Sequence, residues 1–215
     1  MRLDPDGAQL FPAAFSPGQV SALENLLAFG DRPGTRLEPL PGLAALVRPA
    51  TAIAAAILGP EARPVRALLF DKSPGRNWAL GWHQDRAIAV RRRVDAPGFT
   101  GWTVKAGIPH VVPPFEILAR MLTLRVHLDP AGPDNAPLLI VPGSHRLGRI
   151  AEPDIAAAVD RLGQASCPAE RGDLWLYATP ILHASQRAAR PARRRVLQLL
   201  YSADELPGGF EWLGV

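Results

Sequence analysis

Two side chains that commonly bind metals stand two residues apart in Trp82-His83-Gln84-Asp85. In an extended strand, residues i and i+2 project to the same side, so His83 and Asp85 can reach one metal ion. An imidazole, a carboxylate and a second imidazole form the facial triad that holds Fe(II) and leaves coordination positions open. His-x-Asp alone also occurs by chance, so this hypothesis depends on residues further along the chain.

His183 can supply the second imidazole, because it closely follows a predicted strand over residues 174–177. Eleven residues later, Arg194 opens a strand-like run. A guanidinium there can make a planar two-point pair with the distal carboxylate of a dicarboxylate. Arg193 and Arg195 flank it, and a register slip of one residue would turn a neighbour inward instead. We favour Arg194 and leave the other two as alternatives.

Two helices are predicted to support this site. Ser16-Pro17 supplies a cap and a first-turn proline, and apolar residues follow at helical spacing as far as Leu27, with an end expected at residues 30–34. A second helix is predicted over 43–58, where Pro49 should kink or restart it. We expect both helices to pack on one face of a sheet.

From Val65 onward, short β-prone runs alternate with Pro, Gly, Asn and Asp, which is typical of an antiparallel sandwich or barrel. The predicted strands are 65–70, 78–83, 122–128, 138–141, 174–177 and 196–201, and one further helix is predicted over 154–162. Segment 91–116 is predicted to be a long loop with one strand near 102–105, and we expect it to close over a substrate. The chain therefore reads as one domain, 1–215, with N-terminal helices in 1–64 packed on a β core in 65–215.

Composition excludes several classes of protein. A chain of 215 residues that is 47% hydrophobic and 20% charged is not disordered. Its single cysteine, Cys167, excludes an internal disulfide and a cysteine-based metal site within one chain. The net charge of +4 comes with no aromatic and basic stripe, no apolar run reaches the ~18 residues of a membrane span, and Met1–Gly7 has no signal-like stretch. We expect a cytoplasmic protein with no nucleic-acid or membrane partner.

Six motifs follow one another from about Val65 to the C-terminus. They are Leu69-Phe70-Asp71-Lys72-Ser73-Pro74, Trp82-His83-Gln84-Asp85, Val141-Pro142-Gly143-Ser144-His145-Arg146, Gly172-Asp173, His183-Ala184-Ser185, and Arg194 with its strand. In order and spacing they resemble the phytanoyl-CoA dioxygenase family of Fe(II)- and 2-oxoglutarate-dependent oxygenases. The resemblance implies a mainly β fold with flanking helices, the double-stranded β-helix or cupin-like jelly roll.

The resemblance also implies roles for individual residues. Iron would be held by His83, Asp85 and His183, and Arg194 would pair with the far carboxylate of 2-oxoglutarate. The residues that it suggests as further cosubstrate contacts are Ser185, Gln84, Lys72 and Trp102.

The implied activity is hydroxylation of a small or medium-sized metabolite, in which Fe(II), 2-oxoglutarate and O2 act together and succinate and CO2 are released. An intact Asp85 argues against halogenation, because related halogenases need that coordination position for halide. Desaturation, ring formation and epimerisation are open outcomes of the same chemistry. We expect a monomer or a homodimer.

Two other classes of protein share this ligand set. A cupin-like isomerase or hydrolase without oxygen chemistry would use the same three ligands but would leave Arg194 without a role. A non-catalytic metal-binding jelly roll is the other alternative, and the intact ligand set argues against it.

The remaining histidines have less specific surroundings. Arg125 and His127 lie on the polar face of a predicted strand, so they would line the cavity and contact substrate if that face points into a barrel. His145 belongs to a Pro-Gly-Ser-His turn, where a turn-forming role is expected rather than metal ligation. His110, in the long predicted loop, is expected at the surface.

Overall fold

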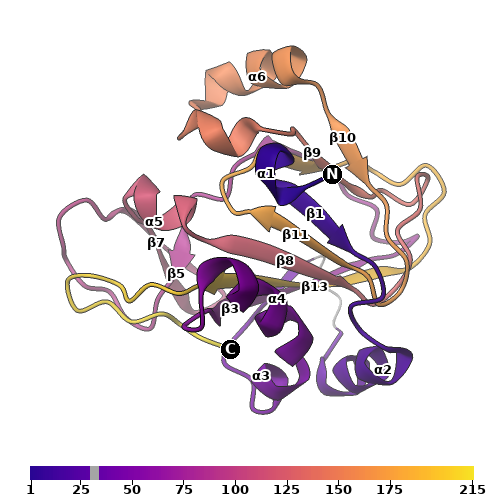
Figure 1. The fold of residues 1–215 in the computed structure, drawn as a ribbon, viewed down its shortest axis with the longest axis horizontal. Coiled ribbons are helices and arrows are strands. Elements are labelled where there is room, and N and C mark those ends of the chain that lie inside the picture. Colours follow the sequence, from indigo (N-terminus) through magenta and orange to yellow (C-terminus); the bar gives the residue numbers. More distant parts are fainter. Residues whose placement is uncertain (30–33) are drawn as a thin grey trace.

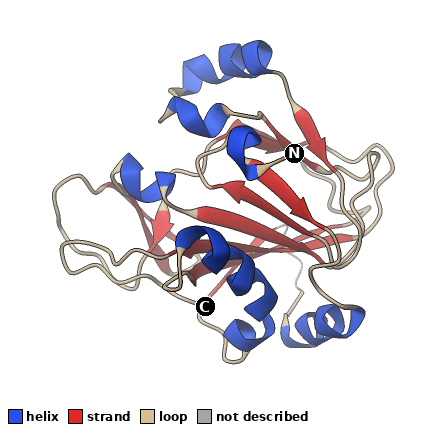
Figure 2. Ribbon diagram, in the orientation of Figure 1, coloured by secondary structure: helices blue, strands red, loops and turns tan. Residues whose placement is uncertain are grey.

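The computed structural model describes residues 1–29 and 34–215, and antiparallel sheets form its centre (Figure 1; Figure 2). The larger sheet has the order β1 (Ala8–Phe11), β11 (Leu174–Ala178), β8 (Leu122–His127), β13 (Arg194–Ser202), β3 (Arg63–Lys72) and β2 (Gly34–Leu37). The smaller sheet has the order β10 (Ala165–Cys167), β9 (Leu138–Ile140), β12 (His183–Ser185) and β4 (Leu80–His83). With helices around these sheets, the predicted jelly roll is confirmed.

Strand β8 shows how the larger sheet acquires two different faces. Leu124 and Val126 are fully buried and pack in the same cluster as the N-terminal helices. Their neighbours Thr123, Arg125 and His127 point to the opposite side, because successive side chains of a strand alternate. These polar residues are also buried, so the polar face does point into the barrel.

The N-terminal helices cover the outer face of the larger sheet (Figure 1). Helix α2 (Pro17–Leu26) begins with a capping box, in which the Gln19 backbone donates to Ser16 Oγ and the Ser16 backbone donates to Gln19 Oε1. The end predicted at 30–34 falls, except for Gly34, outside the described residues. The second predicted helix is present as α3 (Leu43–Leu46) and α4 (Arg48–Leu58), which confirms the restart at Pro49.

Other helices are short. They are α1 (Leu3–Asp6), α5 (Phe115–Ala119), α6 (Ile155–Leu162) and the 3-10 turns η1 (Ser144–Leu147) and η2 (Glu152–Asp154). Helix α6 confirms the one predicted at 154–162. Within the described ranges, none of the helices has the length and apolar character that crossing a bilayer requires.

The prediction of a long loop over 91–116 is wrong. That segment contains an antiparallel hairpin of β6 (Thr100–Lys105) and β7 (Ile108–Val112), and β7 also pairs with β5 (Ile88–Ala89). Ala106 and Gly107 both have positive φ, the backbone of a tight hairpin turn. The many Gly and Pro residues hid the alternation, and only the strand near 102–105 was anticipated.

Gly172, in the turn before β11, joins the N-terminal segment to the larger sheet. Its φ is +90°, its carbonyl accepts from the Phe15 backbone, and an added Cβ would lie 2.4 Å from the Phe15 carbonyl oxygen. Neither backbone can move without breaking this junction, so glycine is required here for two separate reasons.

We expect Gly172→Ala to destabilise the protein by about 3 kcal/mol, because it combines left-handed strain with a clash between backbone segments. Gly42→Ala is the matched control, since Gly42 has φ +89° but open space around it, and should cost only about 1 kcal/mol. Urea unfolding measures both values. Equal losses in the two variants would show that the contact with Phe15 does not matter.

Candidate metal centre

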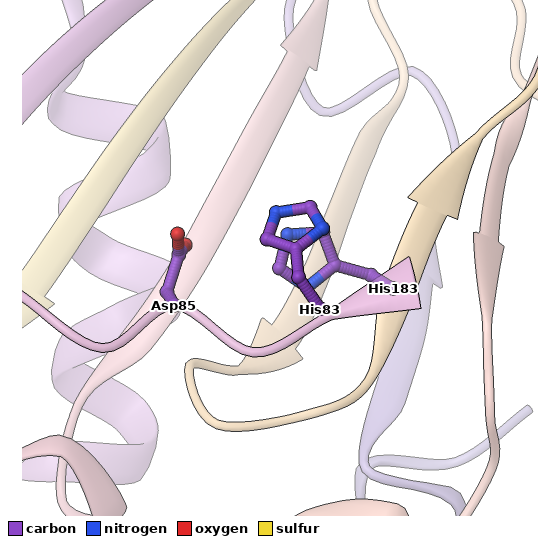
Figure 3. Close-up of side chains that lie close together, drawn as sticks. All are labelled: His83, Asp85 and His183. Carbon is purple, nitrogen blue, oxygen red and sulfur yellow. The ribbon is translucent and has the colours of Figure 1, made fainter. Parts of the chain in front are cut away.

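His83, Asp85 and His183 come together at the edge of the smaller sheet (Figure 3). His83 ends β4, and its pairing partner in register is His183, which begins β12. The two imidazole rings are 4.2 Å apart between centroids, and one ligand atom from each of the three residues lies within 4.8 Å of the others. The i, i+2 spacing therefore brings Asp85 beside the same point as His83.

The two imidazoles are oriented by their own strands. Nδ1 of His83 lies 2.8 Å from the Gly81 carbonyl oxygen, and Nδ1 of His183 lies 3.0 Å from that of Ile181. A carbonyl only accepts, so each Nδ1 carries the proton and each Nε2 keeps its lone pair for a metal. Burial also lowers the pKa of His183 to about 4, which keeps this ring neutral at physiological pH.

The carboxylate of Asp85 completes a donor set that fits a divalent transition metal. Its Oδ2 is buried and has no hydrogen-bond partner, which is costly for a charged oxygen. A cation held between this oxygen and the two Nε2 atoms would satisfy it. The three residues therefore have the donor atoms of a His-Asp-His metal site, and the unpartnered Asp85 oxygen is available to bind the metal.

Gln84 lies between the metal ligands His83 and Asp85, and its side chain holds this segment in place. Its side-chain amide donates to the carbonyl oxygens of Pro180 (2.7 Å) and Gly148 (3.0 Å) and accepts from the Ile150 backbone (2.9 Å). Three backbone partners occupy the amide, which gives Gln84 a positioning role. It also lines the cavity, so the predicted cosubstrate contact stays a prediction.

The Pro-Gly-Ser-His turn has a similar positioning role. Ser144 is fully buried, and its Oγ accepts from the Leu182 backbone at 2.9 Å, directly before His183. The His145 ring packs against Gly7. It is not part of the metal-ligand cluster, which agrees with the expectation that this residue is not a ligand.

A cavity of about 480 Å³ lies between the two sheets, and the triad forms part of its wall. This volume suits a small organic ligand. On the larger sheet its lining includes Leu68, Phe70, Lys72, Arg125, Arg194 and Gln198.

Arg194 is the one of the three neighbouring arginines that enters this cavity. It is 2% exposed, it donates through Nη1 to the Ala136 carbonyl, and its Nε has no partner. Burial and, to a smaller extent, the nearby Arg125 lower its pKa to about 9. The exposed side chain of Arg193 instead pairs with the buried Asp71, and Arg195 makes a two-point pair with Asp129.

Lys72 lies opposite Arg194 in the β3–β13 register. Its Nζ donates to the carbonyl oxygens of Trp78 (2.7 Å) and Gln186 (2.9 Å) and to Ser185 Oγ (2.9 Å). Burial lowers the pKa of Lys72 to about 7, and Arg194 and Arg125 act in the same direction. Lys72 thus closes this end of the cavity and places Ser185, which also lines it.

Two further expected contacts lie outside the cavity lining. Trp102 stacks on Phe210, with 5.9 Å between ring centroids, so the cosubstrate role suggested for it has no support from its position. Arg125 lines the cavity, so a substrate contact there stays a prediction, whereas His127 is fully buried and is not part of the lining.

Sequence reasoning also missed residues. His110, expected at the surface, is 1% exposed and lines the cavity. Arg36, Arg66 and Lys105 line it as well. Of these, Arg66 could have been identified from the sequence, because it lies within an apolar strand-like run and a charged residue is rarely buried there unless it binds a partner.

Fold and site together define a class, the cupin-fold jelly rolls that carry a facial-triad donor set. Within this class the chain belongs to the Phytanoyl-CoA dioxygenase (PhyH) family, whose model matches residues 33–196. The family resemblance seen in the motifs is therefore confirmed. No curated protein sequence matches the chain.

Solved structures share the fold at low identity. EctD from S. alaskensis, crystallised with 2-oxoglutarate and 5-hydroxyectoine, is 22% identical with a TM-score of 0.69, over 99% of this chain and 77% of EctD. AviO1 from Streptomyces viridochromogenes is 21% identical with a TM-score of 0.68, over 96% of this chain and 94% of AviO1. SnoK, a non-heme alpha ketoglutarate dependent carbocyclase from nogalamycin biosynthesis, is 17% identical with a TM-score of 0.68, over 99% and 85% of the two chains. At these identities the comparisons show the shared fold.

We expect Gln84→Ala to weaken metal binding by about tenfold or more, because supports of this kind typically contribute that much to affinity. Asn77→Ala is the control: Asn77 also bonds the backbone through both ends of its amide, at Ala188, but it does not line the cavity. Anaerobic titration with Fe(II) against a chelating dye measures the affinity. Unchanged affinity in Gln84→Ala would remove its positioning role.

Proposed function

We propose that this protein is an Fe(II)- and 2-oxoglutarate-dependent oxygenase that hydroxylates a small or medium-sized metabolite. The observation that carries the proposal is the His83–Asp85–His183 cluster on the wall of a cavity that also contains the buried guanidinium of Arg194. Membership of the PhyH family and the 2-oxoglutarate in EctD, which has the same fold, support the same cofactors.

Each residue has a defined task in this proposal. His83 Nε2, His183 Nε2 and a carboxylate oxygen of Asp85 would hold Fe(II), which supplies O2 activation when bound. Arg194 would bind the distal carboxylate of 2-oxoglutarate in a two-point pair, and Ser185 lies beside it at the Lys72 end. The protein's part is to orient both organic molecules and to exclude water.

Hydroxylation balances as one oxygen atom of O2 entering succinate and the other entering the substrate, with CO2 lost from 2-oxoglutarate. The intact Asp85 supports this outcome over halogenation, because the carboxylate occupies the position that halide would need. The 5-hydroxyectoine in EctD is a hydroxylated compound bound to a protein of the same fold, whereas SnoK is a carbocyclase.

We also propose that residues 1–215 act as one domain, since the helices and the larger sheet share one core cluster.

The cofactor assignment is tested by adding Fe(II) and then 2-oxoglutarate to the apoprotein without oxygen. A visible metal-to-ligand charge-transfer band should form only when both are present, and His183→Ala should lack it. Arg194→Met should still bind Fe(II) but bind 2-oxoglutarate about tenfold or more weakly, because a charged hydrogen-bonded pair is lost. Arg193→Met is the matched control and should behave as the wild type.

A protein that binds metal but forms no band with 2-oxoglutarate would instead indicate a cupin-like isomerase or hydrolase. Equal 2-oxoglutarate affinity in Arg194→Met and the wild type would overturn the anchor assignment alone.

The reaction type is tested by mass spectrometry of metabolite mixtures incubated with the iron-loaded enzyme in isotopically labelled dioxygen. Hydroxylation predicts a product heavier than its substrate by one labelled oxygen atom, formed together with succinate. A product lighter by two hydrogens, or of unchanged mass, would contradict hydroxylation and indicate desaturation, ring closure or epimerisation.

A further inference from the structure

A second group of cations lies in the cavity, apart from Arg194. Arg36 on β2, Arg66 on β3 and Lys105 on β6 all line it. Arg66 is 9% exposed, and the Nε atoms of Arg36 and Arg66 are buried without a hydrogen-bond partner. Three elements that are far apart in the chain therefore direct like charges into one space.

These three cations affect one another. Burial lowers the pKa of Lys105, and Arg36 and Arg66 lower it further. Burial also lowers the pKa of Arg66, with Asp85 opposing and Arg36 adding to the effect. Residues 1–29 and 34–215 provide no ion pair within 4.0 Å for any of the three. Arg66 is buried and Arg36 is half-buried, so keeping these two like charges together costs free energy that a bound anion would offset, whereas Lys105 is exposed at the rim.

His110 adds a neutral polar group to the same place. Its Nδ1 lies 2.8 Å from the Ile108 carbonyl oxygen, so the proton is on Nδ1, and the buried Nε2 has no partner. Burial, with a smaller contribution from nearby cations that include Arg66, lowers its pKa to about 4. The imidazole therefore adds no charge, and its free Nε2 can accept a hydrogen bond from a ligand.

The metal ligands lie between this group and the Arg194 end. On β3, Arg66, Leu68, Phe70 and Lys72 all line the cavity, so six residues of strand, about 20 Å, separate the two cationic ends. On the opposite wall, Leu80 pairs with Ser185 near Lys72, His83 pairs with His183, and Asp85 follows, where it interacts with Arg66.

We propose that the substrate carries an anionic group, a carboxylate or a phosphate, that binds between Arg36, Arg66 and Lys105. This inference rests on the proposed function, because it assigns the Arg194 end to 2-oxoglutarate and the other end to substrate. Seven Lys and Arg side chains line the cavity against two carboxylates, those of Asp85 and Glu152. The charges of a divalent metal ion and of 2-oxoglutarate cancel, so the cavity stays positive with both bound and favours an anionic substrate over a neutral one.

The test is isothermal titration calorimetry with inorganic phosphate and with acetate, against chloride at equal ionic strength. The protein is loaded with redox-inactive Mn(II) and 2-oxoglutarate, which fill the other end of the cavity, and the apoprotein is titrated in parallel. The loaded wild type should bind phosphate or acetate. Arg66→Met and Lys105→Met should each bind the anion about tenfold or more weakly. Lys105 lies on an exposed hairpin, so Lys105→Met should fold normally. It therefore tests the site even if Arg66→Met has a folding defect.

Arg91→Met is the control, because Arg91 pairs with Glu211 at the surface and does not line the cavity. Its anion affinity should equal that of the wild type. Tighter binding of phosphate than of acetate indicates a phosphate ester as substrate, and the reverse order indicates a carboxylic acid.

The proposal is overturned if the loaded wild type binds neither anion, or if Arg66→Met and Lys105→Met bind it as the wild type does. Its failure is distinguishable from failure of the proposed function. If Mn(II) and 2-oxoglutarate do not bind but the apoprotein binds anion through Arg66 and Lys105, the anion site stands and the oxygenase assignment fails.

Discussion

The register of β4 against β12 places His83 opposite His183, and the rest of the site depends on this pairing. A slip of one residue would turn one imidazole to the other face of the sheet and remove it from the cluster. β4 is an edge strand with a single partner, so side chains must supplement its ladder. Gln84 supplies three hydrogen bonds to neighbouring loops, and Ser144 fixes the backbone just before His183.

The second constraint is electrostatic. A jelly roll of this size buries enough apolar surface on the outer face of its larger sheet, against α2, α3 and α4, to tolerate an unfavourable interior. That interior contains cations at both ends of the cavity and, at its metal-binding wall, an Asp85 oxygen without a partner. Such a distribution of charge is expected where stability is sacrificed for binding. It divides the cavity into an Arg194 end and an Arg36–Arg66–Lys105 end, with the metal ligands between them.

Local patterns predicted a large part of this molecule. The capping residues of α2, the restart at Pro49 and the alternation in β8 are all encoded within a few residues, so the corresponding elements were found. The β6–β7 hairpin was missed because its glycines and prolines obscure the period of two, and short strands such as β2 carry too few residues to show one. The motifs identified His83, Asp85, His183 and Arg194 as candidates, but choosing among the three arginines required the β13 register. The second cationic group could not be predicted, since Arg36, Arg66 and Lys105 meet only through long-range packing of three strands.

The central claim is that the three metal ligands lie between a cosubstrate end and a substrate end of one cavity. A crystal structure of the protein with Mn(II) and 2-oxoglutarate, with anomalous data collected at the manganese edge, tests it most directly. The account predicts one anomalous peak bound by His83, Asp85 and His183, with the distal carboxylate of 2-oxoglutarate on Arg194 and open space at Arg66. A peak elsewhere, or a distal carboxylate bound at Arg36, Arg66 and Lys105, would contradict it.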